Sequence, residues 1–453
     1  MTNWNPVLEG EGGPKYCALA DAIERDIFAG KLNPGDRLPT HRELADELEI
    51  NVSTVTRGYV EAERRGLISG TVGRGTFVAS DARTYSSMVS FEPHAPSLIE
   101  LGSANSLYDL DPDIQEGLKR LIRRKNSNAF MRYTDPRGLP EHRAAGAEWC
   151  KRYRLEVTPD DVLVCSGAQH ALTCCLTGLF RAGDRIATDA FTYPGIKTLA
   201  AMLGIRLVPI TMDGEGMLPE ALDTVCRRES IAGLYLMPGV QNPTTACMSA
   251  SRRENIALIA RKHALTLIED DAYGLTVQSS LPPISSLVPE RSVHIAGLSK
   301  PLAVGLRVAF MSSPKPLRDK LSHAILNTIW MTPSLNAELA SEWIKDGTAD
   351  RVVRLKQDEV GKRFSAVKGL LSGLTYFGRP TGRFLWIKLP EPWRGYSLEA
   401  RAREAGVNIF GAEKFAVGDS IVPAMARISI SGARTTDELL QGVNILLEIL
   451  RKG

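Results

Sequence analysis

Short β-rich apolar runs alternate with helical stretches over most of this 453-residue chain beyond Leu101. Seven such runs follow one another, at residues 162–165, 185–188, 207–210, 233–237, 267–270, 293–296 and 308–311. Strands that alternate with helices favour a layered α/β sheet, because each connecting helix covers a face of the sheet. Ligands of such sheets bind at the carboxyl ends of the strands. We therefore expect an α/β fold whose functional side chains follow its strands.

Lys300 is the most informative residue at these strand ends. It follows the apolar run 293–296, and a glycine-containing loop leads from it to Arg307. A lysine at the end of a buried strand loses water, which lowers the pKa of its amine and makes the amine nucleophilic towards an aldehyde. Ser299 and Arg307 beside it are suited to hold a phosphate. A Schiff-base lysine with a phosphate clamp indicates pyridoxal 5′-phosphate (PLP), although the same residues alone also fit a solvated lysine in a loop.

Further polar motifs follow the other runs. Residues 166–169, Ser-Gly-Ala-Gln, open a helix after the first run, so their backbone amides are placed to cradle a phosphate. Asn242 lies in a Gln-Asn-Pro motif after the fourth run, Asp270 ends the fifth, and Tyr273 comes three residues later. Taken singly, these residues also fit turn formers, helix caps or surface groups.

The first eighty residues have a different pattern. Apolar residues at helical spacing predict a helix over residues 16–27. Thr40 and Glu43 form a capping box that begins a second helix, and a third helix begins at Asn51 after a tight break. Two short helices with such a break are the helix-turn-helix arrangement. The two β-rich runs within residues 67–78 predict a hairpin, or wing, with an arginine at its tip.

Residues 31–78, from KLNPGDRLPTHREL to GLISGTVGRGTFV, resemble the winged helix-turn-helix of the GntR family. The resemblance implies that Arg42 reads a base edge, that hydroxyl groups contact the backbone or bases, and that the wing enters the minor groove. The implied DNA-binding residues are Thr40, Arg42, Ser53, Thr54, Thr56, Arg57, Gly73, Arg74 and Gly75. Residues 1–80 hold nine basic against twelve acidic residues, a net charge of −3, so positive charge must be concentrated on the recognition face. A helical adaptor without DNA affinity is the alternative.

Residues 98–453 resemble the fold type I PLP-dependent enzymes of the aspartate aminotransferase superfamily. The residues that carry the resemblance occur in the family's order: Asn242, Asp270, Tyr273, Lys300, Arg307 and Arg427. The resemblance implies a large α/β domain to about residue 333 and a smaller α/β domain over about 334–453. It also implies that the amine of Lys300 forms the Schiff base with PLP and that Asp270 pairs with the pyridinium nitrogen.

The same resemblance assigns the remaining contacts. Arg427 would take a substrate or effector carboxylate with two parallel hydrogen bonds. The other implied PLP-binding residues are Ala168, Gln169, Tyr193, Asn242, Tyr273, Ser299, Arg307 and Tyr133, the last reaching the phosphate in the site of a partner subunit. Two departures from the family, Gly297 in place of a hydroxyl residue and Thr245 in place of glycine, predict weakened cofactor binding.

The cysteine content and the absence of long apolar segments indicate the cellular compartment in which we expect this protein. Seven cysteines, an odd number without a CxxC pair, indicate reduced thiols, and we expect no metal site. The first residues have no apolar targeting segment, and no apolar stretch is long enough to span a bilayer. We therefore expect a cytoplasmic protein without a membrane partner.

The combination of the two modules resembles the MocR subfamily of transcriptional regulators. It implies a DNA-binding domain over residues 1–78, a linker over 79–97 and an aminotransferase-like domain over 98–453. We expect a homodimer that binds double-stranded operator DNA and uses its PLP-binding domain as sensor and dimeriser, with an amino acid or amine as effector and without physiological turnover. Two alternatives stay open: an active PLP-dependent aminotransferase with an auxiliary DNA-binding module, and an inert dimerisation scaffold.

Overall fold

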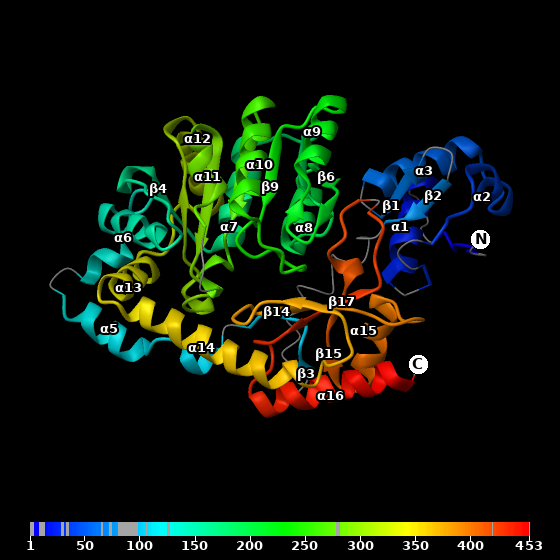
Figure 1. Ribbon diagram of the computed structural model, residues 1–453. Helices are drawn as coiled ribbons and strands as arrows, with labels where there is room; N and C mark the ends of the chain where they lie inside the picture. Colours follow the sequence, from blue (N-terminus) through cyan, green and yellow to red (C-terminus); the bar gives the residue numbers. More distant parts are fainter. Residues whose placement is uncertain are drawn as a thin grey trace.

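The computed structural model describes residues 4–8, 14–28, 31–32, 36–64, 67–71, 75–79, 98–105, 107–124, 127–277, 281–418 and 420–452. The N-terminal module, drawn in blue in Figure 1, consists of α1 (Lys15–Phe28), α2 (His41–Glu47), α3 (Val52–Arg64), β1 (Ile68–Thr71) and β2 (Gly75–Val78). The two strands pair antiparallel. The predicted helices and the hairpin strands are thus confirmed, whereas Gly73, Arg74 and residues 80–97 of the predicted linker lie outside the described residues.

Three local contacts hold the helices of this N-terminal module together. The predicted capping box is present, because Thr40 N–H donates to Glu43 Oε2 at 2.8 Å and Glu43 N–H donates to Thr40 Oγ1 at 3.3 Å. Helices α1 and α3 approach closely at Gly58, where a Cβ atom would lie 2.7 Å from Leu19 Cδ2. The buried Tyr59 hydroxyl donates to the backbone oxygen of Pro39 at 2.8 Å. The helices therefore form one small core of their own.

A seven-stranded sheet forms the centre of the larger domain. Its strands in spatial order are β4 (Val162–Cys165), β12 (Ala309–Ser312), β11 (Ser292–Gly297), β10 (Thr266–Asp270), β9 (Gly233–Leu236), β5 (Arg185–Asp189) and β6 (Arg206–Ile210). All seven predicted runs are strands of this sheet. Neighbouring strands are parallel except at β12, which is antiparallel to both β11 and β4. The reversal brings the residues that precede β12 to the edge where the parallel strands end.

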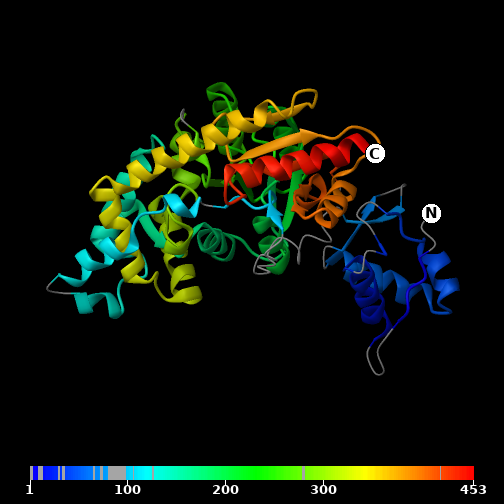
Figure 2. The same cartoon turned by 90° about the horizontal axis from the view of Figure 1, so that it is seen from below.

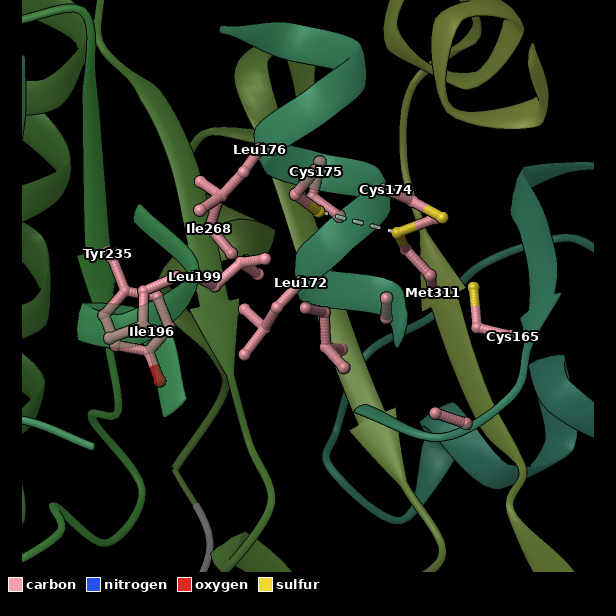
Figure 3. Close-up of a cluster of buried hydrophobic side chains, with 14 of the residues drawn as sticks. Cys165, Leu172, Cys174, Cys175, Leu176, Ile196, Leu199, Tyr235, Ile268 and Met311 are labelled. Atoms are coloured by element: carbon pink, nitrogen blue, oxygen red, sulfur yellow. Dashed lines mark hydrogen bonds between the residues drawn. The ribbon is translucent and has the colours of Figure 1, made fainter. Parts of the chain in front are cut away.

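Helices cover both faces of this sheet (Figure 1). One face packs against α7 (Ala168–Leu179), α8 (Pro194–Met202) and α12 (Lys315–Ile329). The opposite face packs against α6 (Pro140–Lys151), α9 (Pro219–Arg228), α10 (Ala250–Lys262), α11 (Ile284–Leu287) and α13 (Ser334–Lys345). Figure 3 shows the first of these interfaces, where Leu172 and Leu176 of α7 lie near Ile268 of β10 and the Cys175 thiol donates to Met311 Sδ at 3.6 Å. The sheet is thus the middle of three layers.

A second, smaller sheet is antiparallel and contains β13 (Tyr376–Gly378), β14 (Phe384–Lys388), β17 (Met425–Ser429) and β16 (Phe410–Gly411). It shares a core with α14 (Thr348–Lys368), α15 (Gly395–Glu404) and α16 (Thr436–Lys452). Figure 2 shows α14 and α16 side by side. Helix α5 (Ile114–Ile122) packs against α13, which covers one face of the large sheet.

Residues 98–105 join the smaller sheet rather than the larger one. Strand β3 (Ile99–Glu100) pairs in parallel with β15 (Val407–Asn408), and Ile99 and Leu101 are buried in the core of the smaller domain. Ser429 N–H of β17 donates to the backbone oxygen of Leu101 at 2.7 Å. Residues 98–105 come before the larger domain in the sequence but belong to the smaller domain in space. The predicted division into a larger part up to about residue 333 and a smaller part after it did not include this segment in the smaller part.

Candidate functional site

The carboxyl edge of the large sheet collects most of the predicted site residues. Asp270 ends β10, and the loop after β11 carries Lys300. Gly297 of β11 is paired with Ala309 of β12, and Ala309 with Cys165 of β4. Because these pairs lie at one edge, Arg307 and the turn at Gly167 lie beside the end of β11. The structure therefore brings residues far apart in the sequence to one place.

Lys300 is held by a backbone oxygen. Its Nζ donates to the carbonyl of Ala104 at 2.6 Å. Burial of the amine lowers its pKa to about 7, and the positive charges of Arg383, Arg427 and Arg307 act in the same direction. A large fraction of this amine is therefore uncharged near neutral pH, which is the nucleophilic form.

Asp270 is 3% exposed and has one unsatisfied oxygen. Its Oδ2 accepts a hydrogen bond from the Tyr235 hydroxyl at 2.9 Å, whereas Oδ1 is buried without a partner in the described part of the chain. Burial raises the pKa of Asp270 to about 6, although the Tyr235 hydrogen bond lowers it. A buried carboxylate oxygen without a donor is costly unless a ligand supplies one. The protonated ring nitrogen of PLP is a fitting donor.

A phosphate-sized cradle lies where α7 begins. Gly167 precedes the helix with φ +87°, and a Cβ atom there would lie 2.6 Å from Nη2 of Arg307. Arg307 itself has φ 49°, and its Nη1 donates to Ser299 Oγ at 3.4 Å. The first amides of α7, at Ala168 and Gln169, add donors and the positive end of the helix dipole. Guanidinium, hydroxyl and helix terminus together fit a phosphate group.

The side chain of Gln169 has a different role from its backbone. Its Nε2 donates to the backbone oxygen of Gly195 at 3.1 Å, and its Oε1 accepts from the Tyr193 hydroxyl at 3.2 Å. Gly195 lies so close beneath this tyrosine that a Cβ atom would be 2.3 Å from Tyr193 Cε1. Burial raises the pKa of Tyr193 to about 12. Tyr193 is thus a fixed, neutral aromatic side chain beside the cradle.

Tyr273 and Asn242 complete the predicted ring contacts. Tyr273 is buried edge-on against Phe384, with ring centroids 5.0 Å apart. Asn242 is buried, and its Oδ1 accepts from Nη1 of Arg427 at 2.5 Å. Thr245, which stands where the family has glycine, adopts φ 64°. That left-handed conformation explains why glycine suits this position.

Arg427, the predicted carboxylate-binding residue, is enclosed by aromatic rings. Its guanidinium lies 4.3 Å from the ring of Phe384, 4.7 Å from that of Phe415 and 5.4 Å from that of Phe410. Nη2 donates to the backbone oxygen of Gly102 at 2.5 Å. Burial lowers its pKa to about 10, so it stays charged at neutral pH. It is placed to exchange the neutral oxygen of Gly102 for a carboxylate.

Three features of the site escaped the sequence analysis. Arg383 is 2% exposed and donates to the backbone oxygens of Asn105 at 2.8 Å and Lys300 at 2.7 Å. Tyr235 lies within the apolar strand β9. A hydroxyl group in such a run is the one sequence signal that could have marked it as a site residue. Residues 102–105, which we call the inner segment, have no periodicity that could reveal their place in the site.

Tyr133 does not join this chain's own site. It is 83% exposed, and its ring lies 5.7 Å from that of Trp330, which is itself exposed. Its predicted contact with a partner subunit's phosphate stays a prediction.

Most of the predicted DNA-binding residues of the N-terminal module are near its surface. Arg42 and Ser53 are exposed, Thr54 is half-buried, and Thr56 Oγ1 donates to the Val52 oxygen at 2.9 Å. Arg57 lies 4.2 Å from the ring centre of Tyr16. Gly75 of the wing has φ +114°, and a Cβ atom there would lie 2.9 Å from Nε of Arg37, a basic residue outside the predicted DNA-binding set.

Three further features of the described residues concern metal-binding clusters, disulfides and membrane-spanning helices. Among the described residues, no cluster of three or more His, Cys, Asp or Glu side chains is placed to hold a metal ion. All seven cysteines are free thiols. Within the same residues, no helix combines the length and the apolar character needed to cross a membrane.

Two family models match this chain. Residues 96–446 match aminotransferase class I and II, and residues 15–78 match the gntR family of bacterial regulatory proteins. An uncharacterized HTH-type transcriptional regulator of Bacillus subtilis, YdeF, is 36% identical over 99% of this chain and 97% of its own length. The vitamin B6 salvage pathway transcriptional repressor PtsJ of Salmonella typhimurium is 29% identical over 67% of this chain and 68% of its own length.

Solved structures agree with these family matches. The α-aminoadipate aminotransferase LysN of Thermus thermophilus, complexed with N-(5′-phosphopyridoxyl)-L-leucine, has a TM-score of 0.71 and 26% identity, covering 80% of this chain and 94% of that one. An archaeal alanine:glyoxylate aminotransferase has a TM-score of 0.75 at 22% identity, covering 87% of this chain and 99% of that one, and it shows the fold alone.

Proposed function

The chain belongs to the aminotransferase class I and II family and carries a gntR-family regulatory domain at its N-terminus, and from this premise we propose that it is a PLP-responsive, DNA-binding transcriptional regulator. The observation that carries the proposal is the presence, in one chain, of a helix-turn-helix module and the arrangement of Lys300, Asp270 and Arg307. In the division we propose, residues 1–78 bind DNA, 79–97 link, and 98–453 bind PLP. The larger part, expected to end at about 333, also includes α13 in space.

In this proposal Lys300 would be the residue that holds PLP covalently, and the unpartnered Oδ1 of Asp270 would accept a hydrogen bond from the protonated ring nitrogen. Gly167, Ser299 and Arg307, with the first amides of α7, would hold the phosphate. When bound, PLP supplies an aldehyde that captures primary amines. Tyr193 would cover one face of the ring, while Asn242 and Tyr273 would lie beside its phenolic oxygen.

The inner segment offers a route from this site to the DNA-binding module. Its carbonyls accept hydrogen bonds from Lys300 and Arg427, at Ala104 and Gly102 respectively. The same stretch continues upstream through β3 towards the linker. A carboxylate on Arg427 would replace the Gly102 oxygen, because a charged acceptor binds a guanidinium more strongly than a neutral one. An effector amino acid would thereby shift the DNA-reading modules, and this is allosteric if affinity differs between the DNA-bound and DNA-free states.

The proposed assembly is a homodimer in the cytoplasm, bound to double-stranded operator DNA. The strong exposure of the Tyr133 ring supports the dimer, because an aromatic side chain aimed at solvent is available to a partner subunit. Thr40, Arg42, Ser53, Thr54, Thr56, Arg57 and the wing residues Gly73, Arg74 and Gly75 would contact the DNA.

An active aminotransferase is the second candidate function. A 2-aminoadipate transaminase of Thermus thermophilus is 29% identical over 64% of this chain. The lowered pKa of the Lys300 amine and the unpartnered Oδ1 of Asp270 support this candidate. Steady turnover of an amino donor and a keto acid would favour this candidate. Half-reactions that stop after one equivalent would favour the regulator.

The test is fluorescence anisotropy of the full-length protein with DNA from upstream of its own gene, with and without PLP. Salt must be held constant, because phosphate contacts make DNA affinity strongly salt-dependent. We expect specific binding whose affinity changes with PLP in the wild type and not in Lys300→Ala. Equal PLP affinity in the presence and absence of operator DNA contradicts the coupling. Absence of PLP binding would leave only the inert scaffold.

A further inference from the structure

Two fully buried arginines of the site lack the usual counter-charge. Arg383 and Arg427 have no ion pair with any carboxylate in the described part of the chain. Arg427 donates to Asn242 Oδ1 and the Gly102 oxygen, and Arg383 donates to the oxygens of Asn105 and Lys300. All four acceptors are neutral. A buried charge that meets only neutral groups is costly, so both guanidiniums keep a capacity for anions.

Arg383 and Arg427 are distinguished by an unsatisfied Nε on a fully buried guanidinium that has no carboxylate partner in the described part of the chain. An unsatisfied Nε also occurs at Arg143, Arg318 and Arg379, but the first two pair with Asp160 and Asp161 and the third is only half-buried. Nε of Arg383 and Nε of Arg427 are both buried without an acceptor. Arg253 is equally buried, at 3% exposed, yet its Nε donates to the Met248 oxygen at 3.2 Å and both terminal nitrogens also donate to backbone oxygens. Arg253 therefore shows what a fully satisfied buried arginine looks like in this fold, and the two site arginines differ from it.

The carboxylates whose charge acts on these two arginines have other hydrogen-bond partners. Asp111, whose charge favours the protonated form of Arg383, accepts from Nζ of Lys356 at 2.5 Å. Glu100 has the same influence on Arg427, and its Oε1 accepts from the amides of Gly102 and Ser103. Burial lowers the pKa of Arg383 to about 10, so it remains a cation at neutral pH. The missing anion must therefore come from outside these groups.

Three cations converge on one short stretch of backbone. Arg427, Lys300 and Arg383 donate to the carbonyls of Gly102, Ala104 and Asn105, all within the inner segment. A ligand that takes the place of these carbonyls must satisfy two guanidiniums as well as the Lys300 amine. A monocarboxylic amino acid would leave one guanidinium unpaired, whereas a second carboxylate would pair with it.

We propose that Arg383 is a second carboxylate-binding residue, so that the effector is an amino dicarboxylate with its α-carboxylate on Arg427 and its side-chain carboxylate on Arg383. The inference rests on the proposed function, because PLP at Lys300 is needed to capture the amine. It goes further by selecting one class among the amino acids and amines that the site could take.

The test compares matched amino acids on the full-length protein loaded with PLP. L-glutamate is paired with L-glutamine, and L-2-aminoadipate with L-norleucine, with affinity followed by calorimetry and by the absorbance of bound PLP. We expect at least one dicarboxylate to bind about 30-fold or more tightly than its neutral partner, since a buried charge pair of this kind is worth a factor of that order. Equal affinities within both pairs overturn the inference, whatever any variant does.

Substitutions at Arg383 test whether this residue causes the preference for dicarboxylates. In Arg383→Met the ratio between dicarboxylate and neutral partner should fall to near one, and Arg383→Lys should restore part of it. Arg427→Met should weaken both members of each pair. Arg253→Met, which removes an equally buried arginine elsewhere, should leave the ratio unchanged even where it lowers the melting temperature.

The outcomes separate the two proposals. PLP absorbance is recorded before any amino acid is added, so a wild type that binds no PLP contradicts the proposed function directly. A wild type that binds PLP and prefers dicarboxylates, together with an Arg383→Met protein that keeps that preference, contradicts only the role of Arg383. Where Arg383→Met does not fold, the Arg383→Lys ratio decides in its place: a ratio identical to that of the wild type counts against a bidentate guanidinium contact.

Discussion

Tyr235 donates its hydroxyl proton to Oδ2 of Asp270 at 2.9 Å inside the large sheet, which leaves Oδ1 as the oxygen available to a ligand. The tyrosine comes from β9 and the aspartate from the neighbouring β10. One hydrogen bond therefore fixes the rotamer of the carboxylate and lowers its pKa. Asp270 is oriented before any cofactor arrives.

The substitution Tyr235→Phe should weaken PLP binding. It removes the donor from a buried carboxylate, which raises the pKa of Asp270 further and costs about 1–3 kcal/mol where an acceptor is left unsatisfied. We expect PLP affinity, measured by absorbance titration, to fall by about fivefold or more on this scale. Tyr153→Phe is the matched control, because the buried Tyr153 hydroxyl has no partner within the described residues. Equal losses in both variants would contradict an orienting role for Tyr235.

The capture of PLP should depend on pH through Lys300. Because the pKa of this amine is lowered from 10.5 to about 7, the uncharged form grows between pH 6 and 8. The rate of PLP attachment should therefore rise with pH, with a midpoint near pH 7, in stopped-flow absorbance measurements. A midpoint near the ordinary value of 10.5 would show that the amine is not desolvated.

The same shift affects the stability of the cofactor-free protein. Between pH 7 and 10.5 the unfolded chain keeps a proton on Lys300 that the folded chain has released, so the free energy of unfolding rises with pH through this window. Lys300→Met removes this contribution. Denaturant titrations at pH 7 and 9 should show a smaller pH-dependent gain in the variant than in the wild type, and identical gains would contradict the prediction.

Gly167→Ala and Gly183→Ala separate backbone strain from loss of the phosphate cradle. Both glycines have φ near +90°, but an added Cβ meets Nη2 of Arg307 at 2.6 Å in the first case and nothing within 4 Å in the second. Each substitution should cost about 1–3 kcal/mol of unfolding free energy from the strained backbone. Only Gly167→Ala should also weaken binding of PLP and of inorganic phosphate. Parallel losses of ligand affinity in both variants would count against the cradle.

Arg42→Ala should reduce operator affinity. An exposed arginine that reads a base edge contributes about 1–3 kcal/mol, and its loss should also relax the preference at one base pair. Arg401→Ala removes a similarly exposed arginine from α15 of the aminotransferase-like domain and serves as control. Operator affinity is measured by fluorescence anisotropy at constant salt. If Arg42→Ala and Arg401→Ala both bind operator DNA as tightly as the wild type, Arg42 does not read a base edge.

Much of this protein can be predicted from its sequence, because the relevant signals are local. The seven apolar runs, the capping box at Thr40 and the helix breaks depend on residues a few positions apart. Lys300 and Asp270 could be located because each follows a buried strand, and parallel strands end at one edge whatever their order in the sheet.

Which carbonyl oxygens the buried cations contact could be learned only from the tertiary structure. Arg427 and Gly102 are 325 residues apart in the chain, Lys300 and Ala104 are 196 apart, and Arg383 and Asn105 are 278 apart. No periodicity links such pairs, because their contact depends on how β3 and β14 are placed around the large sheet. Local sequence patterns were sufficient to predict the two modules and the strand-end residues of the site. Burial and long-range packing decided that its cations converge on the inner segment, and that Arg383 is one of them.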